Sequence, residues 1–155
     1  MSTPSIQISE HVAGMLNNVD GWHAERRNYP MLQKSEVPNE GFIMQVIPNG
    51  YALLEDNQSR GVFVEQYSVA VTCYRKANVL AEQDEALEDI DRVRRYLLST
   101  SLTEVIITGD AGTGNAMLRN TMLNNPEMDM DRLKDEHVFQ SVIQLDYVLY
   151  RERAQ

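Results

Sequence analysis

Basic residues are scarce in this chain of 155 residues. Fourteen Lys and Arg residues stand against 23 Asp and Glu residues, which gives a formal net charge of −9 at pH 7. The only basic runs, Arg26-Arg27 and Arg92-Val93-Arg94-Arg95, are too short for the clustered positive surface on which non-specific nucleic-acid binding depends. The composition therefore disfavours attachment to nucleic acid or to anionic lipid. It remains compatible with a repulsive surface that DNA passes.

The chain also shows no cysteine pair, no pattern typical of a leader peptide and no long apolar run. Cys73 is the only cysteine, so no intramolecular disulfide forms and a secreted disulfide scaffold is excluded. Residues 1–5 show neither the basic nor the apolar region of a signal peptide. No apolar run approaches the roughly 20 residues that span a bilayer. We therefore expect a protein kept in the cytosol, or in a particle assembled there, without membrane contact.

What the chain does have is the composition of a folded domain. Hydrophobic residues make up 43% of it and charged residues 24%, as in ordinary globular proteins. Domains typically contain about 100–150 residues. We therefore expect one domain over residues 1–155, with a core that needs neither disulfide nor metal.

Two segments have the periodicity of amphipathic helices. The first is predicted to begin at Thr3 as N-cap, with Pro4 in the first turn, and to end before Gly21. The second covers about residues 80–98, with acidic residues first and arginines later, as the helix dipole favours. The two apolar stripes are Ile8, Val12, Met15, Leu16 and Val19, and Leu80, Leu87, Ile90, Val93 and Leu97.

Alternating apolar and polar residues predict antiparallel strands. Residues 42–47 and 51–54 flank Pro48-Asn49-Gly50, and Asn-Gly between apolar runs predicts a hairpin turn. A second polar turn at 56–61 precedes a longer strand. The strands predicted after it, with their core-facing residues, are 62–74 (Phe63, Tyr67, Val69, Val71, Cys73), 104–108, and 138–150 (Phe139, Ile143, Leu145, Tyr147, Leu149). The predicted fold class is α+β: an antiparallel sheet with helices packed on one face.

A polar segment, residues 109–136, lies between the last two strands. Its glycines at 109, 112 and 114 and its Asn124-Asn125-Pro126 predict a long flexible insertion, with one helical turn around residues 116–123. Methionine supplies adaptable apolar contacts at partner surfaces. The methionines of this segment are therefore candidate partner contacts: Met122, Met128 and Met130.

Two aromatic residues, Trp22 and Tyr29, lie in an irregular segment at 22–40. Interface hot spots favour Trp and Tyr, which makes both residues candidate partner contacts. The equally weighted alternative is that they pack their loop onto the core.

No set of residues in the chain predicts catalysis, a cofactor or a metal site. His11, His23 and His137 are far apart and lack ligand spacing. Cys73 is expected to be a buried, inert thiol on a strand. The acidic residues between Glu82 and Asp89 are expected to form the solvated face of a helix.

The loop at residues 109–114 supplies an alternative function. Together with the apolar strand that precedes it, this loop resembles the strand and loop that hold S-adenosylmethionine in methyltransferases. That alternative is a small ligand-binding domain or a methyltransferase-like enzyme. No run of alternating strands and helices follows, however, to complete a doubly wound sheet. A flexible connection is therefore favoured.

The order of elements resembles the tail-terminator proteins of tailed bacteriophages and related minor tail and neck proteins. The resemblance is carried by the order of these elements: an N-terminal helix, a proline-bearing segment, a β-hairpin, a long strand ending in Val69–Arg75, an amphipathic helix, a short strand, a variable insertion and the terminal strand 142–151. The 109–136 insertion is longer than in that pattern.

The resemblance implies a homo-hexameric ring in the virion, assembled in the host cytoplasm. The ring would end tail-tube growth by contacting tail-tube protein and would join the tail to neck or connector proteins. DNA would pass through it without specific binding, and the chain would not be an enzyme. A stand-alone adaptor module is a third possibility.

Overall fold

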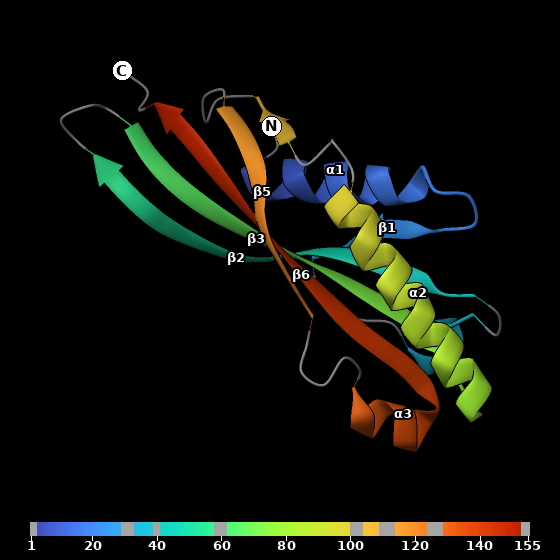
Figure 1. The fold of residues 1–155 in the computed structure, drawn as a ribbon. Helices are drawn as coiled ribbons and strands as arrows, with labels where there is room; N and C mark the ends of the chain where they lie inside the picture. Colours follow the sequence, from blue (N-terminus) through green and yellow to red (C-terminus); the bar gives the residue numbers. More distant parts are fainter. Residues whose placement is uncertain are drawn as a thin grey trace.

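Six strands form one curled, mostly antiparallel sheet, and two long helices pack on its inner face (Figure 1). This computed structural model describes residues 3–28, 33–38, 41–57, 62–99, 104–108, 114–123 and 129–152. These residues make one α+β domain, which confirms the predicted fold class. The strand order is β1-β2-β3-β6-β5-β4. The elements are α1 (Pro4–Asn17), β1 (Ala24–Arg26), the 3-10 helix η1 (Lys34–Glu36), β2 (Ile43–Asn57), β3 (Val62–Lys76), α2 (Leu80–Ser99), β4 (Glu104–Ile107), β5 (Gly114–Leu123), α3 (Met130–Glu136) and β6 (Val138–Glu152).

The central strands β3 and β6 pair without interruption along their whole lengths. Their antiparallel register runs from Val62 opposite Glu152 to Lys76 opposite Val138. Successive side chains on a strand point to opposite faces, and the face that carries Val71 and Ile143 packs in the core. The predicted core-facing residues of both strands are buried, except Phe63, which is half-buried. β3 and β6 are therefore the two central strands on which the rest of the sheet is built.

The predicted hairpin turn at Pro48-Asn49-Gly50 is wrong, because β2 runs straight through it. β2 pairs with β3 from Ile43 to Asn57, and the register skips one residue between Pro48 and Gly50. Asn49 is therefore a β-bulge, in which one extra residue bends the strand. The connection from β2 to β3 falls instead in the second polar turn, whose residues 58–61 lie outside the described part of the chain.

The predicted helical turn at residues 116–123 is also wrong. Residues 114–123 form β5, which pairs antiparallel with both β4 and β6. The register of β5 skips Arg119, just before Asn120 opposite Asp146. The other glycines of this segment, at 109 and 112, lie outside the described residues, and its end forms α3.

The bulge at Asn49 in β2 and the bulge at Arg119 in β5 lie on one row across four strands. In that row Gly50 pairs with Ser68, Ser68 with Asp146, and Asp146 with Asn120. The Ser68 hydroxyl donates to the Asp146 carboxylate at 2.7 Å. We call the sheet beyond this row, towards the β2–β3 connection, the distal half. It comprises Tyr51–Asn57 of β2, Val62–Tyr67 of β3, Gly114–Leu118 of β5, Tyr147–Glu152 of β6 and all of β4.

Helix α1 lies inside the curl of the sheet. The Thr3 side chain caps it by accepting from the Ile6 N–H at 3.4 Å, as predicted. The helix ends at Asn17, earlier than Val19, and the turn after it contains Gly21 at a φ of 84°. Along its length α1 contacts β1 and β2 near one edge of the sheet and β4 at the other. The sheet therefore wraps around this helix as a half-barrel.

Helix α2 covers the inner face where β3 ends and β6 begins. Its buried apolar residues are Ala86, Ile90, Val93 and Leu97. Leu87 is half-buried, whereas Leu80, expected in the buried stripe, is 72% exposed. The reason is that the first turn of α2 projects past the sheet (Figure 1). No described helix is both long and apolar enough to cross a membrane.

The segment at 22–40, predicted to be irregular, contains two short elements. β1 pairs parallel with β2, with Ala24 opposite Met44, which makes the sheet mixed. The Asn17 side chain fixes the start of this strand through two hydrogen bonds of 2.8 Å. Its amide oxygen accepts from the Ala24 N–H, and its amide nitrogen donates to the Ala24 carbonyl. Near η1, Val37 packs with Tyr74 and Val138 in a small second core.

Candidate interaction surface

Three of the candidate partner contacts predicted from the sequence lie within the described residues, on three different elements or loops. Trp22 is half-buried, and its ring lies edge-on to Phe42 at 6.0 Å and to Tyr96 at 5.5 Å. Trp22 therefore packs its loop onto the core, which is the alternative interpretation given above. Met130 opens α3 and is 58% exposed. Met122 lies on β5, opposite Gln144 of β6, and Tyr29 and Met128 lie outside the described residues.

The lone thiol is buried, as predicted. Cys73 is 1% exposed on the inner face of β3. Burial raises the pKa of the Cys73 thiol far above its ordinary value, and the nearby Asp89 charge raises it further, so the thiol stays protonated. Within the described ranges, no group of three or more His, Cys, Asp and Glu residues lies close enough to hold a metal ion.

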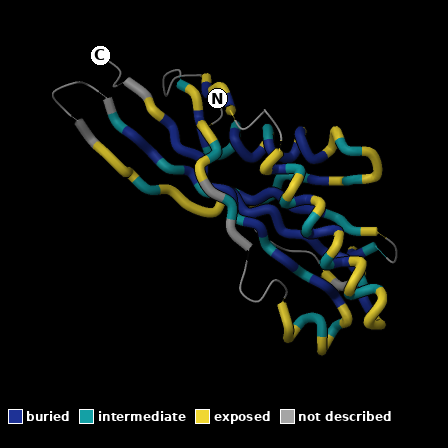
Figure 2. The backbone as a smooth tube through the Cα atoms, viewed as in Figure 1, coloured by how far each residue is buried: buried dark blue, intermediate teal, exposed yellow. Residues whose placement is uncertain are grey.

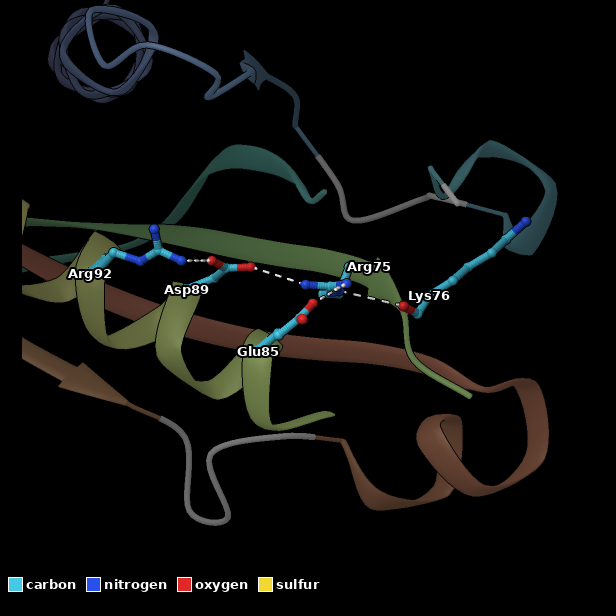
Figure 3. A network of polar contacts seen from close by, with 5 residues as sticks. All are labelled: Arg75, Lys76, Glu85, Asp89 and Arg92. Atoms are coloured by element: carbon cyan, nitrogen blue, oxygen red, sulfur yellow. Dashed lines mark hydrogen bonds and ion pairs between the residues drawn. The ribbon is translucent and has the colours of Figure 1, made fainter. Parts of the chain in front are cut away.

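One acidic residue of α2 departs from the predicted solvated face. Asp89 is 9% exposed and accepts from the guanidinium of Arg75, which is 7% exposed, at 3.2 Å. Glu85 contacts the same guanidinium at 3.4 Å, and Arg92 pairs with the other oxygen of Asp89 (Figure 3). This network ties the end of β3 to α2. Its role is structural, because both buried charges are paired with each other.

The glycine-bearing loop at 109–114 does not have the setting that its alternative function needs. It connects β4 to β5, and these two strands pair antiparallel, with Ile107 opposite Gly114. A nucleotide-binding loop of the proposed type leads from a strand into a helix, whose N-terminus faces the ligand. Here the loop leads into a strand.

A buried carboxylate accepts hydrogen bonds from two tyrosines on the inner face of the distal half. Glu65 is 2% exposed, and one of its oxygens accepts from the hydroxyls of Tyr51 at 2.6 Å and Tyr67 at 3.1 Å. Tyr147 lies beside Tyr67 on β6. Burial raises the pKa of Tyr147 to about 12, and its hydroxyl has no hydrogen-bond partner among the described residues. The cluster fastens β2 to β3 through its tyrosines.

Exposed apolar side chains concentrate on the distal half. Of the ten large hydrophobic residues exposed in the described part of the chain, six lie there: Tyr51, Leu53, Leu54, Ile106, Met117 and Tyr150. The tips of β2, β3 and β6 extend beyond both long helices (Figure 1), and exposed residues line the outermost strand (Figure 2). By register, Tyr51 and Leu53 lie on the inner face of the sheet, whereas Met117 and Tyr150 lie on its outer face. Exposed apolar side chains gathered in one part of a molecule are typical of sites of protein contact.

The distal part of β2 is also an edge of the sheet. β1 pairs only with Met44–Val46 of β2, so beyond Val46 no strand in the described residues lies on that side. Register shifts after Pro48 and after Leu53 twist this edge, and such bulges discourage backbone pairing with another chain. The bulged edge is therefore poorly suited to pairing with an added strand.

A groove of about 480 Å³ lies on the outer face of the distal half. Its lining comes from four neighbouring strands: Leu54, Glu55, Val64, Arg119, Val148 and Tyr150. Val64 and Val148 are 8% and 5% exposed and form an apolar floor. Arg119 of β5 donates to the Tyr150 hydroxyl at 2.9 Å, and Glu55 of β2 stands on the opposite wall. The groove is suited to apolar side chains flanked by charge.

Comparison with models of known protein families gives no match, and comparison with curated protein sequences gives none. The function is therefore argued from the surface itself. Sequence reasoning missed this surface because residues 51–54 were assigned to the arm of a short hairpin, and Arg119 to a helical turn. The signal that was present is the pair of apolar residues Leu53-Leu54 next to the polar turn.

Proposed function

We propose that this chain is a structural virion protein of the tail-terminator type, a subunit of a ring at the head-proximal end of a phage tail. The observation that carries the proposal is the distal half of the sheet, with its groove and six exposed apolar side chains. Large exposed apolar patches are rare on monomers and mark contact surfaces. A subunit of a permanent assembly has such a surface because a neighbour covers it.

The architecture supports the same proposal. A mostly antiparallel sheet with its long helices on one face is the arrangement that the resemblance to tail terminators implies. In the proposed homo-hexamer, one side of the ring contacts the last ring of tail-tube protein and ends tube growth. The other side contacts the neck or connector.

The charge of the chain fits a ring through which DNA passes. A net charge of −9 repels the phosphate backbone. DNA would therefore move through the ring without specific binding. The role is mechanical, and the proposal assigns the chain neither a catalytic residue nor a cofactor.

The test is electron microscopy of virions in which the chain carries a small tag that binds gold particles. The expected result is gold at a single level, the joint between head and tail. Particles assembled without the chain should carry tail tubes of irregular length, and supplying the untagged chain should restore one length. Gold along the whole tube, gold at the far tip, or tubes of normal length without the chain would overturn the proposal.

A further inference from the structure

We propose that neighbouring copies of this chain meet head to tail, with Val79 and Leu80 of one copy seated in the groove of the next. The inference rests on the proposed function, because it names the contact by which ring subunits join. It assigns the groove an occupant, a second copy of the chain. We call the pair Val79-Leu80 the α2 knob.

The α2 knob contains Leu80, the most exposed of the large hydrophobic residues in the described part of the chain. Val79 is 54% exposed and Leu80 is 72% exposed. The two are adjacent in the chain, and the helix buries its apolar face only from Ala86 onward. The knob and the groove lie at opposite ends of the molecule (Figure 1). One copy therefore cannot bring its own knob to its own groove, and only another copy can supply it.

The groove offers the knob an apolar floor and enough space. Its floor of Val64 and Val148 is apolar and nearly closed to solvent, and Leu54 extends the apolar surface at the rim. Two aliphatic side chains that project from a helix end fit a space of about 480 Å³. Removing both surfaces from water is favourable in proportion to the apolar area covered.

The charges next to each feature select one orientation. Glu82 and Asp84 follow the knob, and the first two turns of α2 carry no basic residue. In the groove, Arg119 stands on the β5 wall and Glu55 on the β2 wall. The acidic turns are attracted to Arg119 and repelled by Glu55, and such complementarity fixes the register of an interface.

Two different surfaces at opposite ends of one chain give a heterologous contact. A contact of this kind closes into a ring when the rotation between copies allows it, and otherwise forms a filament. A twofold dimer would instead place the same patch on both sides. The head-to-tail contact is therefore the type that a ring of identical subunits requires.

The experiment uses two variants, each blocking one surface, and a matched control. Leu80→Asp charges the knob and Leu54→Asp charges the rim of the groove; both positions are exposed, so each variant should keep the wild-type melting temperature. Leu98→Asp is the control, because Leu98 is 57% exposed at the other end of α2, outside both surfaces. Sedimentation velocity is expected to show monomers for each blocked variant alone and wild-type behaviour for the control.

The decisive sample is an equal mixture of the two blocked variants. A head-to-tail contact leaves one intact knob and one intact groove, so the mixture should form dimers and nothing larger. Rings from the wild type together with a monomeric mixture would overturn the knob-and-groove contact while leaving the ring function intact. Rings formed by either blocked variant alone would likewise overturn the knob-and-groove contact and leave the ring function intact.

A cross-linking measurement covers the case in which the purified wild type is monomeric. Leu54→Cys and Leu80→Cys proteins are mixed and treated with a short bis-maleimide, while the native Cys73 stays protected by burial. The expected product is the mixed 54–80 dimer, well above the level given by Leu98→Cys in place of Leu80→Cys. Equal yields, or mainly 54–54 and 80–80 products, would overturn the contact. A mixed dimer without gold at the head–tail joint would overturn the proposed function and not the contact.

Discussion

The ion pair between Arg75 and Asp89 should be among the most sensitive points of the fold. The two side chains are 9% and 12% exposed, so Asp89→Ala leaves a buried guanidinium without its main partner. Removing one partner of a buried pair costs about 3–5 kcal/mol. Glu85 remains beside Arg75 at 3.4 Å, which places the expected loss near the lower end, at about 3 kcal/mol.

Urea denaturation measures this loss. With a slope of about 1–3 kcal/mol per molar urea, the midpoint of Asp89→Ala should fall by about 1–3 M. The slope itself should not change, because the native packing elsewhere is kept.

Two further variants separate the buried pair from its exposed neighbour. Arg92 also pairs with Asp89, but its side chain is 64% exposed, so Arg92→Ala should cost about 1 kcal/mol or less. The double variant Arg75→Met with Asp89→Leu should recover most of the stability that Asp89→Ala loses, because no lone charge stays buried. Equal midpoints for Asp89→Ala and Arg92→Ala would refute the reasoning.

Three other predictions follow from burial. Leu97→Ala, at a site 1% exposed, should cost about 2–5 kcal/mol, whereas Leu80→Ala on the same helix should leave the urea midpoint nearly unchanged; equal shifts would contradict the placement of α2. Tyr147→Phe should not lower stability, since the hydroxyl lacks a partner in the described residues, and it should remove one late-ionising tyrosine from the ultraviolet titration. Because burial raises the pKa of Tyr147 from 10 to about 12, the wild type should lose stability as pH rises between these values, more steeply than Tyr147→Phe. Cys73 should react with a thiol reagent only after unfolding, and rapid labelling of the native protein would disprove its burial.

Long periodic segments could be predicted from the sequence, because one principle acts over many residues in each. In α1 the positions of Ile8, Val12 and Leu16 repeat every four residues, and all three are buried. In β6 every second residue from Ile143 to Leu149 is apolar and buried. The fold class follows from such segments, since a sheet with one apolar face needs helices to cover it.

The bulges could not be predicted, because an extra residue changes the phase of the alternation. In β2, Met44 and Val46 face inward before Asn49, and Tyr51 and Leu53 do so after it, as their partners on β3 show. A break in phase next to Asn-Gly looks the same in sequence as a turn between two strands. The same phase shift at Arg119 breaks the strand pattern of β5. β1 has too few residues to show an alternation of apolar and polar side chains.

The groove was beyond sequence reasoning for a different reason. Its lining residues come from four strands that are far apart in the chain, and only the register brings Val64 of β3 beside Tyr150 of β6. The ion pair of Asp89 with Arg75 could not be predicted for the same reason, because Arg75 lies on a different element. Single exposed residues such as Leu80 carry no sequence signal that separates them from core positions at the same helical spacing.

The uninterrupted ladder between β3 and β6 has a mechanical consequence. It spans the sheet from the end near the start of α2 to the distal half, so a pull along the strands between these ends acts on its hydrogen bonds in shear. Bonds loaded in shear share the force and must break together, whereas bonds at the edge between β4 and β5, pulled sideways, separate one after another. In the proposed ring, a subunit held at both ends would therefore resist most strongly a pull along these two strands.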